Sequence, residues 1–142
     1  MSSDVAQTVS QLLQAGWTLT SPTKTDIYWG VTRPETVDFL ALGKQIVVNC
    51  YNPMGDVVVA EPLSREVWKR VESVVVDVIV KAGDMATAVS TRESIRNEVY
   101  RVIHMSDPSF WVEKETYKVE SPEIVRLTLI VKYISFTVKG TS

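Results

Sequence analysis

The segment WKRVESVVVDVIVK, residues 68–81, is so rich in valine that it predicts a long β-strand. Successive side chains of a strand point to opposite faces. One face of this strand is wholly apolar and carries Val74, Val76, Val78 and Val80. The other face is mixed, since Asp77 and Lys81 lie on it among apolar residues. We therefore expect helices to cover the apolar face, and water or a neighbouring subunit to meet the mixed face.

A helix is predicted directly after this strand, in STRESIRNEVYRVIHM, residues 90–105. Ser90 and Glu93 have the spacing of a capping box, in which each side chain bonds the other residue's backbone amide. Asp107-Pro108 is expected to end the helix. Its buried stripe consists of Ile95, Val99, Val102 and Ile103. Residues 82–89 are expected to form a linker.

The N-terminal residues 4–15 predict another helix, because their apolar side chains recur at helical spacing along one face. Ser3 is expected to cap this helix and Gly16 to end it. The loop that follows, residues 21–34, carries two large aromatic residues, Tyr28 and Trp29. They either fold back on the core of their own domain or anchor a partner, since aromatic residues concentrate at the centres of interfaces.

Gln45 to Tyr51 predicts a short strand, followed by a tight turn at residues 52–55 and a return strand from Val57 to Ala60. A loop or single helical turn is expected up to Glu66. Near the C-terminus, Phe110 to Glu120 and Glu123 to Lys139 predict two further strands.

The last predicted strand is far longer than the usual strand length of about five or six residues, and it is apolar on both faces. One small domain rarely covers both faces of such a strand, so we expect a homo-oligomer. The predicted fold class is α+β: an antiparallel sheet with two helices packed on one face, in the order α-β-β-α-β-β, with a long C-terminal strand. At 142 residues the chain fits a single domain, 1–142.

The composition argues against several classes of partner. The formal net charge of -2 and a pI near 5.4 give no overall attraction to phosphate, so we expect no membrane and no sequence-specific nucleic acid among the partners. No apolar run has the length of a membrane span, and the N-terminus does not resemble a signal peptide, so we expect assembly in a cytoplasm. A single cysteine, Cys50, agrees with a reducing compartment.

No catalytic, cofactor or metal site is predicted. A nucleophile–base pair would have to be Cys50 with His104, but Cys50 lies in an apolar strand and His104 near a helix end, where both are usually structural. Glu113 and Glu115 share a strand face, but the lysines beside them indicate a solvated strand of mixed charge rather than a metal site. The glycines are scattered singly and form no phosphate-binding loop.

Arg92 and Arg96 lie one turn apart on the second predicted helix. They either belong to a solvated face or form a salt-bridging contact between subunits. The candidate subunit or partner contacts are Tyr28, Trp29, Asp77, Lys81, Arg92 and Arg96.

The order of these motifs resembles the tail-terminator (tail-completion) proteins of long-tailed phages and archaeal tailed viruses. The residues that carry the resemblance are Trp68-Lys69-Arg70, Ser73 to Val78, Ser90 to Glu93, Glu98 to Ile103, the strand Val125 to Val131 and the loop Asp26 to Pro34. The resemblance implies a virion structural protein at the head-proximal end of the tail. Such a subunit forms a homo-oligomeric ring, commonly a hexamer, that stops growth of the tail tube and presents a surface to head-completion or neck proteins.

Two alternatives stay open. The chain is either another head–tail connector or neck protein, or a small non-enzymatic regulatory module that binds nucleic acid through Arg92, Arg96 and Arg101.

Overall fold

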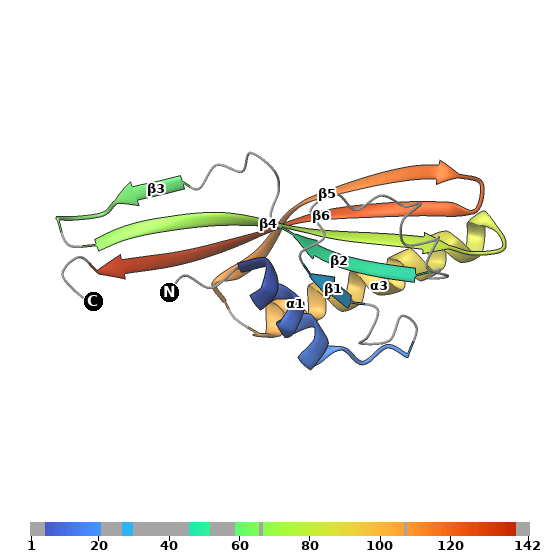
Figure 1. The fold of residues 1–142 in the computed structure, drawn as a ribbon, viewed down its shortest axis with the longest axis horizontal. Coiled ribbons are helices and arrows are strands. Elements are labelled where there is room, and N and C mark those ends of the chain that lie inside the picture. Colours follow the sequence, from blue (N-terminus) through green and yellow to red (C-terminus); the bar gives the residue numbers. More distant parts are fainter. Residues whose placement is uncertain are drawn as a thin grey trace.

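The computed structural model describes residues 5–20, 27–29, 46–51, 59–65, 67–106 and 108–138. Within these ranges two helices and six strands follow one another along the chain (Figure 1). Their bounds are α1 (Val5–Gly16), β1 (Ile27–Trp29), β2 (Ile46–Tyr51), β3 (Val59–Pro62), β4 (Val67–Lys81), α3 (Met85–Ser106), β5 (Phe110–Ser121) and β6 (Ile124–Val138). No helix in the described ranges is long and apolar enough to span a membrane.

All six strands belong to one sheet, in the order β1-β2-β4-β6-β5, with β3 paired to β4 as well. β4 and β6 form its axis, because they pair antiparallel without interruption from Val67↔Val138 to Lys81↔Ile124. The expected wholly antiparallel sheet is wrong, because β1 pairs with β2 in parallel. The predicted loop around Tyr28 therefore contains an additional strand, too short for its sequence pattern to reveal.

The helices lie against only part of the sheet (Figure 1). α1 contacts β1, β2 and β4, and α3 contacts β4, β5 and β6. Beyond them extends a three-stranded ribbon that we call the arm: β3, residues 67–72 of β4 and residues 134–138 of β6. We call the remainder the body. The expected packing of both helices across one face of the sheet thus needs correction, since the arm extends past them.

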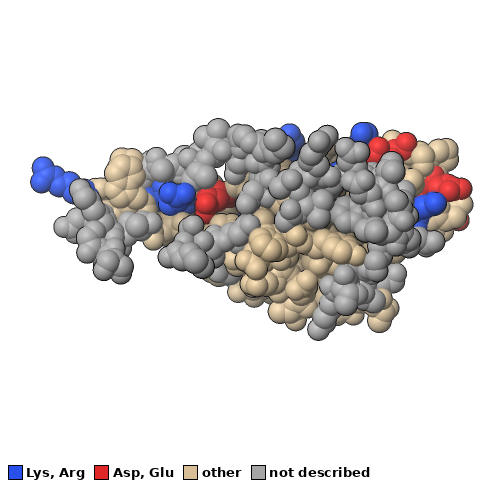
Figure 2. Space-filling model, viewed as in Figure 1, with Lys and Arg blue, Asp and Glu red and all other residues tan. Residues whose placement is uncertain are grey.

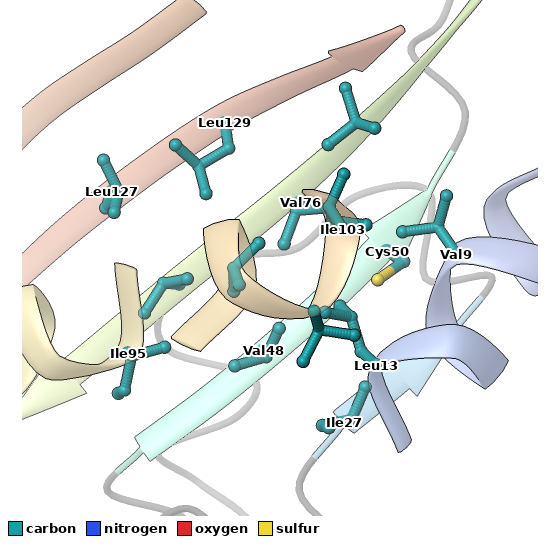
Figure 3. Packing of buried hydrophobic residues seen from close by; sticks show 14 of the residues in the cluster. Val9, Leu13, Ile27, Val48, Cys50, Val76, Ile95, Ile103, Leu127 and Leu129 are labelled. Atoms are coloured by element: carbon teal, nitrogen blue, oxygen red, sulfur yellow. The ribbon is translucent and has the colours of Figure 1, made fainter. Parts of the chain in front are cut away.

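The body has a continuous apolar core to which both helices and the sheet contribute (Figure 3). α1 supplies Val9 and Leu13, and α3 supplies Ile95 and Ile103, which meet Val76 and its neighbours on the sheet. These side chains are at most 2% exposed. The predicted apolar face of β4 is therefore the core face, as its alternation indicated.

A buried carboxylate connects the two helices. Glu98 of α3 accepts hydrogen bonds from the Thr18 amide at 2.6 Å and the Thr18 hydroxyl at 2.8 Å, and from Arg101 Nε at 2.9 Å. Arg101 also donates to the carbonyl of Gly16, the last residue of α1, at 2.6 Å. A β-carbon at Gly16 would lie 3.1 Å from a methyl group of Val102. Glycine at this position thus permits the close approach of α1 to α3.

α3 begins five residues earlier than the predicted cap at Ser90. Asp84 caps it, since its carboxylate accepts bonds from the Thr87 amide at 2.8 Å and the Thr87 hydroxyl at 3.0 Å. Ser90 lies inside the helix. The expected linker 82–89 contains methionine and alanines, which favour helix, so the helix extends back to the first residue able to cap it.

The strand predicted at Val57 to Ala60 is shifted, because β3 spans Val59–Pro62 and pairs with β4. The predicted turn at residues 52–55 and the proposed cap Ser3 lie outside the described residues. Both long C-terminal strands are present near their predicted bounds.

Candidate interaction surfaces

The arm has the features of an interaction surface. β3 lies on one edge of β4 and the end of β6 on the other, and the Leu63 amide donates to the Val67 carbonyl at 2.9 Å to close the turn between β3 and β4. Neither helix covers this ribbon (Figure 1). Its shape follows from the length of β4 and β6, which continue well past the part of the sheet that the helices cover.

Large apolar side chains are exposed at the tip and on both faces of the arm. Leu63 at the turn is 52% exposed, Trp68 41% and Phe136 58%. Phe136 pairs with Lys69 and shares its face, so Trp68, the neighbour of Lys69, lies on the opposite face. Large apolar side chains exposed on both faces and at the tip of one short ribbon favour an interaction surface there.

Leu63, Trp68 and Phe136 were not among the predicted contacts. The available signal was indirect: a last strand too long and too apolar for one domain to cover. From that signal the sequence predicts a homo-oligomer, which stays a prediction, and it could not show which end of the strand would extend beyond the helices.

The two aromatic residues, predicted either to fold back on the core or to anchor a partner, differ in their exposure. Tyr28 is half-buried and packs against Val47 and Ile79, which form a small apolar cluster on the face of the sheet opposite the main core. Trp29 is 44% exposed. Of the pair, Trp29 exposes more of its side chain, and whether it contacts a partner stays a prediction.

On the mixed face of β4, Asp77 is fully buried and paired with Arg126 of β6. Arg126 Nε donates to the Asp77 carboxylate at 2.8 Å, and the Thr128 hydroxyl donates to it at 3.2 Å. The hydrogen bond with Asp77 raises the pKa of Arg126. Burial, followed by the negative charge of Asp77, raises the pKa of Tyr51. Because Asp77 is fully buried, Arg126 is the partner in this ion pair that lies nearer to solvent, with its side chain 19% exposed.

Arg92 and Arg96 both contact side chains of β5. Arg92 is 9% exposed and its guanidinium stacks on the Tyr117 ring at 4.6 Å, while Arg96 donates to Glu115. The hydrogen bond that Arg96 donates to Glu115 raises the pKa of Arg96. These contacts attach α3 to the edge of the sheet. Whether Arg92 and Arg96 also touch a second subunit stays a prediction, as it does for half-buried Lys81 at the end of β4.

Glu113 and Glu115 do not share a face as predicted. A register shift between Val112 and Lys114 interrupts the alternation of β5. Glu113 lies 3.8 Å from Lys132, and Glu115 bonds Arg96 on the helix side. The described residues contain no group of three or more His, Cys, Asp or Glu side chains that could hold a metal ion.

Cys50 and His104 have different environments. Cys50 lies in the apolar core, where burial raises the pKa of its thiol (Figure 3). His104 is exposed on α3, with its ring edge-on to Tyr100 at 5.4 Å. The structure thus places the thiol in the core and the imidazole at the surface.

Among the described residues, α1 carries no charged side chain, and none is visible over it in Figure 2. Basic and acidic side chains are both visible toward the arm, and charges of both signs also lie at the opposite end of the body (Figure 2). The outline in that view is elongated, with the arm at one end.

Comparisons with known proteins give a structural likeness but no sequence family. No protein-family model matches the sequence, and no curated protein matches it. Among solved structures, a chain from the "Virion of native gene transfer agent (GTA) particle" has a similar fold, with a TM-score of 0.56 at 18% sequence identity. The match covers 93% of this chain and 92% of that chain. At this identity the likeness establishes a shared fold over nearly the whole length of both chains.

Proposed function

We propose that this chain is a virion structural protein of tail-terminator type, without catalytic activity. Copies assemble into a ring, for which a hexamer is our leading expectation. The ring caps the tail tube at its head-proximal end and docks to a head-completion or neck protein. The similar chain comes from a virion particle, and the likeness spans both chains almost completely, which supports a role in a particle of related build.

The observation that carries the assembly part of the proposal is the arm. A ribbon that extends past the helices and exposes Leu63, Trp68 and Phe136 is unfavourable for an isolated subunit in water. It becomes favourable once a neighbouring subunit or another virion protein covers it. A ring requires two different surfaces on each subunit, and the arm and the far end of the body are separate enough to serve as these.

The nucleic-acid-binding alternative receives less support from the geometry. Each arginine of the proposed basic face already has a carboxylate partner: Arg92 has Glu93 at 3.1 Å, Arg101 has Glu98 at 2.9 Å, and Arg96 has Glu115. These pairs reduce the positive potential that would attract phosphate. The connector or neck alternative differs from the leading proposal only in its docking partner.

Electron microscopy of the purified protein, alone and mixed with tail tubes of the matching particle, tests the proposal. We expect rings that bind one end of the tube. Trp68→Asp should abolish the rings, because it places a charge on the surface of the arm that we expect to be covered. Gln11→Asp is the matched control, since Gln11 is exposed on α1, which packs on the body rather than on the arm, and should leave assembly intact.

A wild-type protein that stays monomeric and binds neither tube end would contradict the proposal. Binding to head connectors rather than to tubes would instead favour the neck alternative.

A further inference from the structure

Among the described strands, only β4 lies beside the last residues of β6. β5 pairs with β6 as far as Phe110↔Tyr133, and the final bond from that side runs from the Ile134 amide to the Ser109 carbonyl at 3.0 Å. From residue 135 to residue 138 the strand pairs with β4, and no described strand lies along its other edge. We call this segment the distal edge.

The backbone direction along the distal edge follows from the bond at Ile134. The N–H and C=O groups of one residue in an antiparallel strand point to the same side, and successive residues alternate. Because Ile134 donates away from β4, Phe136 and Val138 also direct their N–H and C=O groups away from β4. The distal edge therefore presents four backbone groups to a possible further strand.

The distal edge differs in sequence from the outer edge of β5. β5 carries Glu113, Lys114 and Lys118 as exposed charges, the usual protection of an edge against unwanted pairing. Residues 134–138, ISFTV, contain no charge and no proline, and Phe136 is 58% exposed. An uncharged edge of residues with high β-propensity is suited to accept another strand.

We propose that the distal edge pairs antiparallel with the distal edge of a second copy of this chain. An uncharged, proline-free strand of similar length is the best-suited partner. Among the described edges, β3 contains Glu61 and Pro62, β5 is charged and β1 has three residues, whereas the distal edge itself meets all three conditions. A two-fold contact uses the same surface on both copies, so this one segment is sufficient.

The backbone directions select one register. With the two-fold axis beside Thr137, Phe136 of each copy lies opposite Val138 of the other, and all four outward groups of each copy form hydrogen bonds. The two Phe136 rings become diagonal neighbours on the same face of a continuous ribbon, within reach of each other. This contact does not rest on the proposed ring, because a two-fold contact alone joins two copies and cannot close a ring of more.

A cysteine cross-link in the full-length protein tests the register. Thr137→Cys places two cysteines opposite each other at the axis, in a pair whose Cα atoms lie roughly 4.5 Å apart, within the range for a disulfide. Under mild oxidation we expect most of this variant to migrate as a disulfide-linked dimer on a non-reducing gel. Ser135→Cys is the control, since its two copies lie far from each other in this register, and the native Cys50 is fully buried.

Proline substitution tests the role of the backbone groups. Phe136→Pro removes an N–H that points away from β4, so the melting temperature should be nearly unchanged while dimer formation in sedimentation experiments falls at least tenfold. Ser135→Pro removes an N–H that points to β4 and should lower the melting temperature. Equal cross-linking of Thr137→Cys and Ser135→Cys, or undiminished dimers of Phe136→Pro, would overturn the proposed pairing.

The outcomes for the pairing and for the ring can be told apart. Rings without the Thr137→Cys cross-link would overturn the pairing alone. Cross-linked pairs that form no rings, with or without tail tubes, would overturn the ring alone.

Discussion

Glu98 is the residue whose charge contributes most clearly to the fold. It is 6% exposed and receives hydrogen bonds from Arg101 and from two groups of Thr18. The bond from Arg101 outweighs the effect of burial and, with those from Thr18, lowers the pKa of Glu98 to about 2. A carboxyl with a depressed folded-state pKa stabilises the fold at neutral pH, and this contribution is lost as the pH falls from about 4.5 towards 2.

We therefore expect Glu98→Gln to lower the free energy of unfolding at pH 7 by about 1–3 kcal/mol, because a neutral amide replaces the acceptor of charge-assisted hydrogen bonds. The difference from wild type should shrink as the pH falls below 4.5, and urea unfolding at several pH values measures it. Glu113→Gln, at an exposed side chain, should have little effect. A difference independent of pH would show that the charge of Glu98 is not the cause.

At the residue scale, the sequence indicated whether a side chain is buried or exposed better than it indicated which residue that side chain would pair with. The apolar strand around Cys50 correctly suggested burial. The alternation of β4 placed Asp77 on the mixed face, but nothing in the sequence could indicate that Arg126, 49 residues away, would pair with it. The ion pair of Glu98 with Arg101 was not predicted, and the contact of Glu98 with Thr18 depends on how α1 and α3 meet.

The N-terminus of α3 provides a prediction at the scale of elements. Asp84→Ala should lower the melting temperature, because the Thr87 amide loses its acceptor. The hydrogen bond from the Thr87 amide lowers the pKa of Asp84, so the effect should be largest above the ordinary range for a carboxyl and fade in acid. Ser90→Ala should be nearly neutral, since Ser90 lies within the helix. A larger effect at Ser90 than at Asp84 would contradict the helix start.

Long elements with a strong pattern were predictable, and short ones were not. β4, β5 and β6 each have enough alternating residues to be recognised from the sequence. β1 has three residues, and its parallel pairing with β2 depends on the tertiary fold. The start of α3 was misplaced because Ser90 and Glu93 match a capping box, although Asp84 and the alanines before them favour an earlier start.

For the whole molecule we expect a gradient of stability along β4 and β6. In the body, residues 74–80 of β4 are at most 4% exposed, whereas residues 67–72 in the arm are half-buried or exposed. Local opening costs less where little apolar surface is buried. Hydrogen exchange of dilute protein should thus be faster at residues 67–72 than at residues 74–80, and equal protection along the strand would contradict this.

The architecture of the whole molecule was predictable in class but not in shape. Two amphipathic helices and several alternating strands indicated an α+β fold. The arm was not foreseen, because its existence depends on where α1 and α3 stop along β4 and β6, and not on a property of either strand alone.

The uninterrupted pairing of β4 with β6 also has a mechanical consequence. The same two strands run from the tip of the arm into the core in one register, without a hinge between the two parts. Tension along the strands loads their hydrogen bonds in shear, all at once, whereas a sideways pull on the tip opens them one pair at a time. Subunits joined through their arms would therefore resist stretching along the arm far better than peeling away from it.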